Sequence, residues 1–112
     1  MSRTAYIVSA VRTPIGKFGG GLADFTAVDL GVVAVRAALE RAFGEAPAER
    51  VPGAAAAPLD RRWRVDEVIF GNARQAGGGP NPARQVAWRA GLGDEVPAFT
   101  VNMACASGLR AA

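Results

Sequence analysis

Hydrophobic residues along the chain fall into short continuous runs and into stretches with a helical period. The runs cover residues 5–11, 65–70 and 98–101, are rich in β-branched and aromatic side chains, and lie next to Pro or Gly. Such runs are typical of buried strands. Between the first two runs, hydrophobic side chains recur every three or four positions, which predicts one buried face of an α-helix; they are Val28, Val32, Val35, Leu39 and Phe43.

Both predicted helices carry sequence signals at their ends. Thr26 and Asp29 have the spacing of a capping box, and Gly44 follows the last apolar position of the first helix. Asn81 precedes a proline and predicts the N-cap of the second helix, which ends before Gly91. The signals therefore predict one helix after Thr26 and another after Asn81.

Two segments between these elements are predicted to be loops. Residues 16–21 hold four glycines but lack the upstream glycine and the following Ser or Thr of a phosphate-binding loop, so a tight turn is favoured there. Residues 45–62 are rich in Ala and Pro and have no period. This composition predicts a flexible insertion with Arg50, Arg61 and Arg62 as the first sites of proteolysis.

The order of the elements predicts an α/β fold. Strand and helix alternate as β-α-β-α-β-α, with a third helix expected after residues 98–101. More than ten residues separate consecutive strands, which is long enough for crossover connections. We therefore expect a mostly parallel sheet that is covered by helices.

Composition fits one modest domain. The chain has 112 residues, 50% of them hydrophobic, and thirteen Lys and Arg against ten Asp and Glu give a net charge of +3. The charges are interspersed, so nucleic-acid binding is not predicted. No apolar run approaches the ~18 residues that a membrane-spanning helix needs, so no membrane association is expected. One cysteine cannot form an internal disulfide, and we expect a cytoplasmic protein.

The chain contains no histidine, which restricts the chemistry that it can perform alone. Histidine is the commonest general base and metal ligand in proteins. Without His and with one Cys, a transition-metal site of ordinary spacing is not expected.

Cys105 is the candidate nucleophile. It follows the predicted strand, and the small residues Ala106, Ser107 and Gly108 follow it. A strand, a tight turn and a helix start in this order expose a reactive side chain, and the helix N-terminus favours a thiolate. A lone cysteine is often only a small buried hydrophobic residue. A core cysteine, however, does not need a glycine three residues later.

The segment from Asn102 to Arg110 resembles the nucleophile motif of the thiolase family. That motif has Asn, two variable residues, Cys, a small residue, Ser-Gly-Leu and a basic residue, and Cys105 takes the Cys position. Three further blocks resemble family signatures in the same order, at residues 11–20, 65–71 and 81–85. The resemblance implies that residues 1–112 are part of a thiolase N-terminal domain, namely the first part of the first of two similar halves with stacked α/β layers.

Three features depart from the usual thiolase pattern. Thiolases usually cross the gap at residues 45–62 in fewer residues. Pro80 stands where Gln is common, and Met103 and Ala104 stand where Lys and Val are more usual. None of these differences changes the candidate nucleophile itself.

The resemblance implies an acyltransferase that moves an acyl group between coenzyme A thioesters. Cys105 would form an acyl-enzyme that acylates acetyl-CoA to give acetoacetyl-CoA, and thiolysis of a 3-ketoacyl-CoA is the reverse. The backbone N–H of Cys105 would help to stabilise the thioester oxyanion. The coenzyme A thioesters are substrates, and no separate cofactor or metal is implied. The full-length enzyme is expected to be a homodimer or homotetramer.

Two alternatives stay open. Another condensing enzyme, such as a ketoacyl synthase, shares the reactive cysteine turn, although residues 12–14 and 81–84 favour a thiolase. The other alternative is a non-catalytic fragment, because the 112 residues lack the activating His and the second Cys of thiolases. We therefore expect the 112-residue chain alone to be inactive. Arg84 is expected to be structural or to face a partner subunit, with a substrate contact as the alternative.

Overall fold

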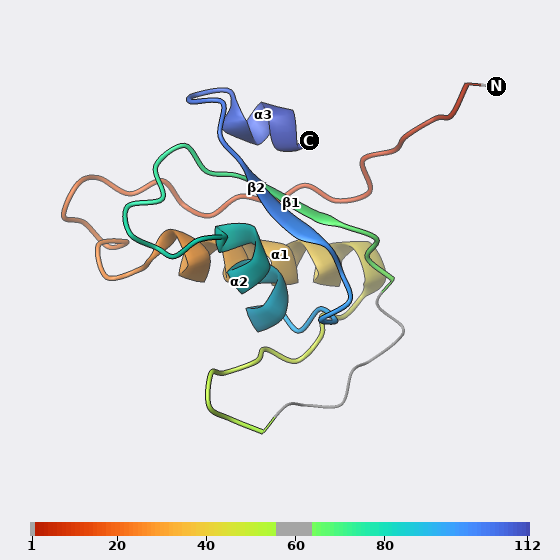
Figure 1. Cartoon of the computed structure of the whole chain (residues 1–112), viewed down its shortest axis with the longest axis horizontal. Helices are drawn as coiled ribbons and strands as arrows, with labels where there is room; N and C mark the ends of the chain where they lie inside the picture. The colour runs from red at the N-terminus through yellow and green to blue at the C-terminus, as the bar shows by residue number, and fades with distance from the viewer. Residues whose placement is uncertain (1, 56–63) are drawn as a thin grey trace.

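The computed structural model describes residues 2–55 and 64–112 (Figure 1). The elements in chain order are α1 (Ala27–Phe43), β1 (Val68–Gly71), α2 (Pro82–Arg89), β2 (Ala98–Val101) and α3 (Ser107–Ala111). The two strands pair in parallel, with Val68 opposite Ala98 and Gly71 opposite Val101. α2 packs against α1 and on both strands, whereas α3 contacts the strands after the turn that follows β2. The predicted α/β class with parallel strands is confirmed.

The N-terminus of α1 has the capping box that the sequence predicts. The Thr26 hydroxyl accepts a hydrogen bond from the Asp29 N–H (3.1 Å), and Asp29 Oδ2 accepts one from the Thr26 N–H (2.8 Å). At the other end, Gly44 has a φ of 86° and donates to the Glu40 carbonyl at 2.8 Å. Glycine adopts this left-handed conformation at little cost, so it ends the helix as expected.

The core lies between α1, α2 and the sheet. Val32 and Leu39 of the predicted apolar face of α1 are buried. The helices approach closely at Gly31, where a Cβ would come within 2.7 Å of Val86 Cγ2. Phe43 is 60% exposed, because it is the last residue of α1 and lies one turn beyond Leu39. The expectation that Phe43 belongs to the buried face is therefore wrong.

Side-chain hydrogen bonds join the start of α2 to β2. Asn81 Oδ1 accepts from the Arg84 N–H (3.3 Å), as the sequence predicts for an N-cap. The Thr100 hydroxyl accepts from the Ala83 N–H (3.0 Å) and donates to Asn81 Oδ1 (2.9 Å). The first turn of α2 is thereby fixed on β2.

Residues 5–11 do not form the predicted strand. Tyr6, Ile7 and Val8 are 79%, 91% and 74% exposed. A strand requires a partner that exchanges backbone hydrogen bonds with it. β1 and β2 pair with each other, and in the part of the chain that the structure describes neither pairs with residues 5–11. The described sheet therefore has two strands, and the prediction of a strand at residues 5–11 was wrong.

The described part of the predicted insertion, residues 45–55, has no helix or strand but includes a buried arginine. Arg50 is 8% exposed, its Nη1 lies 2.8 Å from Asp94 Oδ1, and its guanidinium lies over the Trp88 ring, 5.7 Å from the centroid. Early proteolysis at Arg50 is therefore not expected, which corrects the sequence prediction. Residues 56–62 of the insertion lie outside the described residues, and its flexibility stays a prediction.

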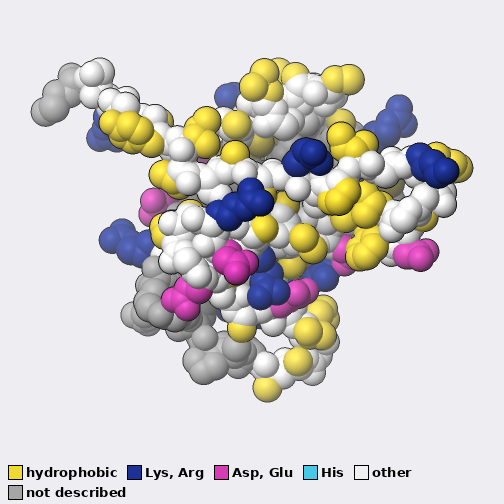
Figure 2. Space-filling view, turned by 180° about the vertical axis from the view of Figure 1, so that it is seen from behind, with side chains coloured by type: hydrophobic (Ala, Val, Ile, Leu, Met, Phe, Trp, Pro, Cys, Tyr) yellow, Lys and Arg dark blue, Asp and Glu magenta, His cyan; other side chains and the backbone are white. Residues whose placement is uncertain are grey.

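Charged side chains join α1, α2 and the segment after α1. Arg89 Nη1 lies 2.6 Å from Asp29 Oδ1, and its Nη2 lies 3.4 Å from Glu49 Oε1. Arg36 Nη1 lies 3.1 Å from Glu49 Oε2. On the face in Figure 2, the acidic side chains lie across the middle and lower part of the molecule, with basic side chains beside several of them. The hydrogen bond from Arg89, and to a smaller extent those from Thr26, lower the pKa of Asp29 from 3.8 to about 2.

We predict that Asp29→Asn lowers the melting temperature above about pH 5, and that this difference shrinks as the pH falls through about 2. Asp29 holds its proton more weakly in the folded chain than in the unfolded chain. Its contribution to stability is therefore complete above its ordinary pKa of 3.8 and is lost as the pH falls through about 2. Thermal unfolding of both proteins across this pH range tests the prediction. A difference in melting temperature that persists unchanged at the acid end would contradict it.

Candidate active site

β2 leads into α3 through a turn at residues 102–106, and Cys105 lies exposed in this turn. Ala104, immediately before the thiol, has a φ of 49°, in the left-handed region. A residue with a Cβ adopts that conformation at a cost of roughly 1–2 kcal/mol, and such residues concentrate at functional sites. The predicted order of strand, turn and helix is present, with an unfavourable backbone conformation next to the thiol.

Two side chains hold this turn. Asn102 Oδ1 accepts from the Ala104 N–H (3.0 Å), and Asn102 Nδ2 donates to the Ala73 carbonyl (3.2 Å). The Ser107 hydroxyl accepts from the Met103 N–H (2.9 Å) and donates to the Ala104 carbonyl (2.6 Å). Both side chains bond to the backbone of Ala104, which explains how it is kept in the left-handed conformation.

α3 begins directly against the end of β1. A Cβ on Gly71 would overlap the backbone of Ser107 and Gly108, so only a glycine leaves room for this contact. Ser107 is 4% exposed at this point. The cysteine turn therefore rests on the carboxyl ends of both parallel strands. In open α/β sheets, ligands bind beyond that end of the strands.

Cys105 itself lies just outside α3. The N-cap is Ala106, and the helix that follows has five residues. The N–H groups of Ala106 and Ser107 donate within the turn, to the carbonyls of Met103 (3.0 Å) and Ala104 (3.1 Å). A helix of this length has a smaller dipole than a long one. The turn therefore serves the thiol mainly by exposing it and by fixing the backbone around it.

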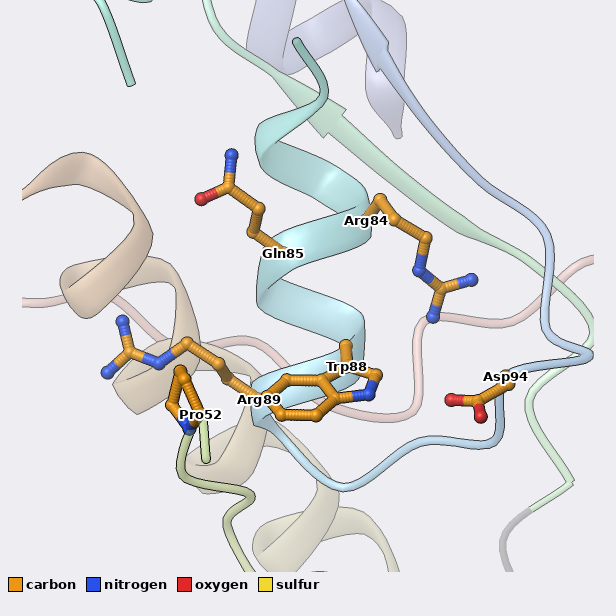
Figure 3. Close-up of a pocket in the computed structure, with 6 residues that line it drawn as sticks. All are labelled: Pro52, Arg84, Gln85, Trp88, Arg89 and Asp94. Carbon is orange, nitrogen blue, oxygen red and sulfur yellow. The ribbon is translucent and has the colours of Figure 1, made fainter. Parts of the chain in front are cut away.

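A separate pocket of about 450 Å³ lies along α2 (Figure 3). Its described lining residues are Pro52, Arg84, Gln85, Trp88, Arg89 and Asp94. None of these belongs to the turn around Cys105. Arg84 Nη1 donates to the Val96 carbonyl at 2.6 Å, which ties α2 to the segment before β2. This contact supports the structural role expected for Arg84.

Within residues 2–55 and 64–112, no group of three or more His, Cys, Asp or Glu is arranged to hold a metal ion. Over the same residues, no helix is both long enough and apolar enough to cross a membrane.

The sequence pattern identifies the candidate nucleophile but not all the residues that hold it in place. Asn102 and Ser107 belong to the motif, yet their spacing alone does not predict which backbone groups they bind. Gly71 lies far away in the sequence and has no place in the motif. Its signal is a glycine at the end of a strand, which often marks a close approach of another backbone.

Comparisons with known proteins agree with this architecture. The model of the family described as "Thiolase, N-terminal domain" matches residues 5–112. An acetyl-CoA acetyltransferase of Escherichia coli is 46% identical over 108 residues, which are 96% of this chain and 23% of that protein. One of Cupriavidus necator is 50% identical over 105 residues, which are 94% of this chain and 23% of that protein.

Solved structures show the same relationship. The Acat5 thiolase of Ascaris suum, in complex with coenzyme A, matches with a TM-score of 0.73 and 34% identity over 94% of this chain and 23% of its own. The acetyl-CoA acetyltransferase of Syntrophomonas wolfei matches with a TM-score of 0.68 and 36% identity over 94% of this chain and 22% of its own. The chain thus spans about a quarter of the length of these relatives, and it belongs to the thiolase family, in the part that the N-terminal domain occupies.

Proposed function

We propose that the chain acts within an acyltransferase of thiolase type that transfers acyl groups between coenzyme A thioesters through an acyl-enzyme on Cys105. The observation that carries the proposal is the exposed thiol in its fixed turn, at the carboxyl ends of two parallel strands, in a chain of this family. An exposed nucleophile on a rigid support can reach a substrate carbonyl without moving the sheet.

The proposed reaction has two covalent steps. The Cys105 thiolate attacks the carbonyl carbon of an acyl-CoA; the new carbon–sulfur bond forms, and the bond to the coenzyme A sulfur breaks with release of coenzyme A. The enolate of acetyl-CoA then attacks the acyl-enzyme carbonyl, which forms a carbon–carbon bond and releases the Cys105 thiolate. Acetyl transfer gives acetoacetyl-CoA, and the reverse direction is thiolytic cleavage of a 3-ketoacyl-CoA.

The backbone N–H of Cys105 is the proposed donor to the thioester oxyanion. Formation of the acetyl-CoA enolate additionally requires a base, and the 112 residues contain no His and no second Cys. We therefore expect the residues beyond these to supply it, and the chain alone to be inactive.

The full-length enzyme is proposed to be a homodimer or homotetramer. A cytoplasmic location is also proposed; a Gibberella zeae relative that is 50% identical over 106 residues is named as cytosolic.

The two alternatives are not equally supported. A ketoacyl synthase is disfavoured, because the match to the thiolase family extends over residues 5–112 rather than over the cysteine turn alone. A non-catalytic fragment would have the same fold and the same exposed Cys105, so only a measurement of acyl transfer distinguishes it from an enzyme.

Incubation of the full-length protein with acetyl-CoA is expected to place an acetyl group on Cys105. The digested protein is analysed by mass spectrometry, and the peptide that contains Cys105 should carry the modification. A sample that is first alkylated with iodoacetamide serves as the control and should remain unacetylated. Acetylation at another residue with a free Cys105 would exclude the proposed nucleophile, and a protein that is never acetylated would support the non-catalytic alternative.

A further inference from the structure

We infer that Ser107 is a positioning residue for Cys105, because its hydroxyl joins the two residues before the thiol to the first residue of α3. The inference rests on the proposed function, since it concerns the residue that would carry the acyl group. It adds a specific side chain to that proposal. Ser107 would act through the backbone of the turn, without touching the substrate itself.

The hydroxyl of Ser107 makes one bond on each side of the Met103–Ala104 peptide. It accepts from the Met103 N–H at 2.9 Å and donates to the Ala104 carbonyl at 2.6 Å. Ser107 is 4% exposed, so water competes little for these bonds. The hydroxyl thereby closes a small loop of backbone that leads into the exposed Cys105.

The conformation of Ala104 shows that this loop needs to be held. With a φ of 49°, Ala104 is in a region that residues with a Cβ avoid. Such a conformation persists only where surrounding contacts impose it. Without the Ser107 hydroxyl, Asn102 would still bind the Ala104 N–H, and the Ser107 N–H would still donate to the Ala104 carbonyl at 3.1 Å. That carbonyl would lose its 2.6 Å bond, however, and the Met103 N–H would lose its acceptor. The peptide that leads into Cys105 would then be held less firmly.

The backbone of Ser107 is itself fixed by the sheet. Its carbonyl group and the following Gly108 nitrogen lie against the bare Cα of Gly71 at the end of β1. The hydroxyl therefore connects a fixed point on the sheet to the turn that carries the thiol. Ser107 therefore helps to place the cysteine turn relative to the sheet, in addition to any contribution that it makes to stability.

Ser107→Ala in the full-length protein is expected to slow acetylation by about 10- to 100-fold, because small misplacements of a reacting group reduce rates by such factors. The KM for acetyl-CoA should change by less than about threefold, since the substitution removes no substrate contact. The measurement is the rate of Cys105 acetylation over a range of acetyl-CoA concentrations.

Thr100→Val is the matched control. The Thr100 hydroxyl has the same pattern of bonds, accepting from the Ala83 N–H at 3.0 Å and donating to Asn81 Oδ1 at 2.9 Å, but it fixes α2 rather than the cysteine turn. Both substitutions should lower the melting temperature. Only Ser107→Ala should lower the acetylation rate; equal effects of the two variants, or a normal rate in Ser107→Ala, would overturn the inference.

A second measurement needs no variant and applies even if Ser107→Ala does not fold. In the wild-type protein, hydrogen exchange at the Met103 amide should be slowed, because its N–H donates to Ser107 Oγ. Exchange at the rate of an unstructured peptide would overturn the inference. The proposed function is tested separately: it fails if Cys105→Ala is still active, whereas an inactive Cys105→Ala with a fully active Ser107→Ala removes only the role of Ser107.

Discussion

Cys105→Ala is expected to reduce acetyl transfer by the full-length enzyme by about 10⁴- to 10⁶-fold, the range seen when a catalytic nucleophile is removed. Cys105 is the single cysteine of the 112 residues. The nearby Ser107 hydroxyl cannot replace its thiol as a nucleophile, because Ser107 is buried and its hydroxyl already makes two hydrogen bonds within the turn. The assay is cleavage of acetoacetyl-CoA by purified full-length protein.

Met103→Leu is a suitable control for this substitution. Met103 lies in the same turn, its side chain is 53% exposed, and leucine has a similar volume. This variant should keep the wild-type rate within about threefold, because its backbone hydrogen bond to Ser107 is retained. Substantial turnover by Cys105→Ala would mean that acyl transfer uses a different nucleophile.

Gly71→Ala is expected to lower the free energy of unfolding by about 3 kcal/mol or more, at the upper end of the usual cost of overpacking. The added Cβ would overlap the backbone of Ser107 and Gly108, which cannot move aside as the tip of a flexible side chain can. The start of α3 would have to leave the end of β1, and Cys105 would move with it. Urea unfolding, with acetylation of Cys105 as a second readout, tests both consequences.

Gly21→Ala provides the comparison for this prediction. A Cβ at Gly21 would meet nothing within 4 Å, and Gly21 has no positive φ that requires glycine. Its substitution should therefore change stability by less than about 0.5 kcal/mol, as is usual at the surface. A Gly71→Ala variant as stable as Gly21→Ala would show that α3 does not rest on β1 in solution.

The parts of the fold that local chemistry determines could be predicted from the sequence. Thr26 and Asp29 start α1, Gly44 ends it, and Asn81 caps α2, each through contacts with residues a few positions away. The strand before Cys105 was found with its observed bounds. Parallel pairing followed from the length of the connection.

The parts that depend on distant partners could not be predicted in this way. Residues 5–11 have a strand-like composition, but a strand exists only where another strand pairs with it. Arg50 lies in an Ala- and Pro-rich segment that suggests exposure, yet it is buried between Asp94 and Trp88, which are far away in the sequence. Composition describes what a segment can do, whereas burial depends on which neighbours the fold provides.

The candidate site likewise has a part that the local sequence predicts and a part that depends on contacts between distant elements. Cys105 could be identified because a strand, a small-residue turn and a helix start are consecutive in the sequence. The contact between Gly71 and the backbone of Ser107 could not, because it joins two elements separated by all of α2 and β2. The hydrogen bonds of Ser107 are local, but they depend on the left-handed conformation of Ala104, which an alanine does not predict.

The two-stranded sheet has a consequence for how the protein behaves in concentrated solution. β1 and β2 pair only with each other within the described residues, so each has one side whose backbone groups lack a strand partner there. Open edges of this kind recruit further strands from other molecules, and Tyr6, Ile7 and Val8 form an exposed segment of high β-propensity that can add to them. Aggregation of the 112-residue chain should accordingly begin at a sheet edge, through intermolecular β-pairing between this segment of one molecule and β1 or β2 of the next.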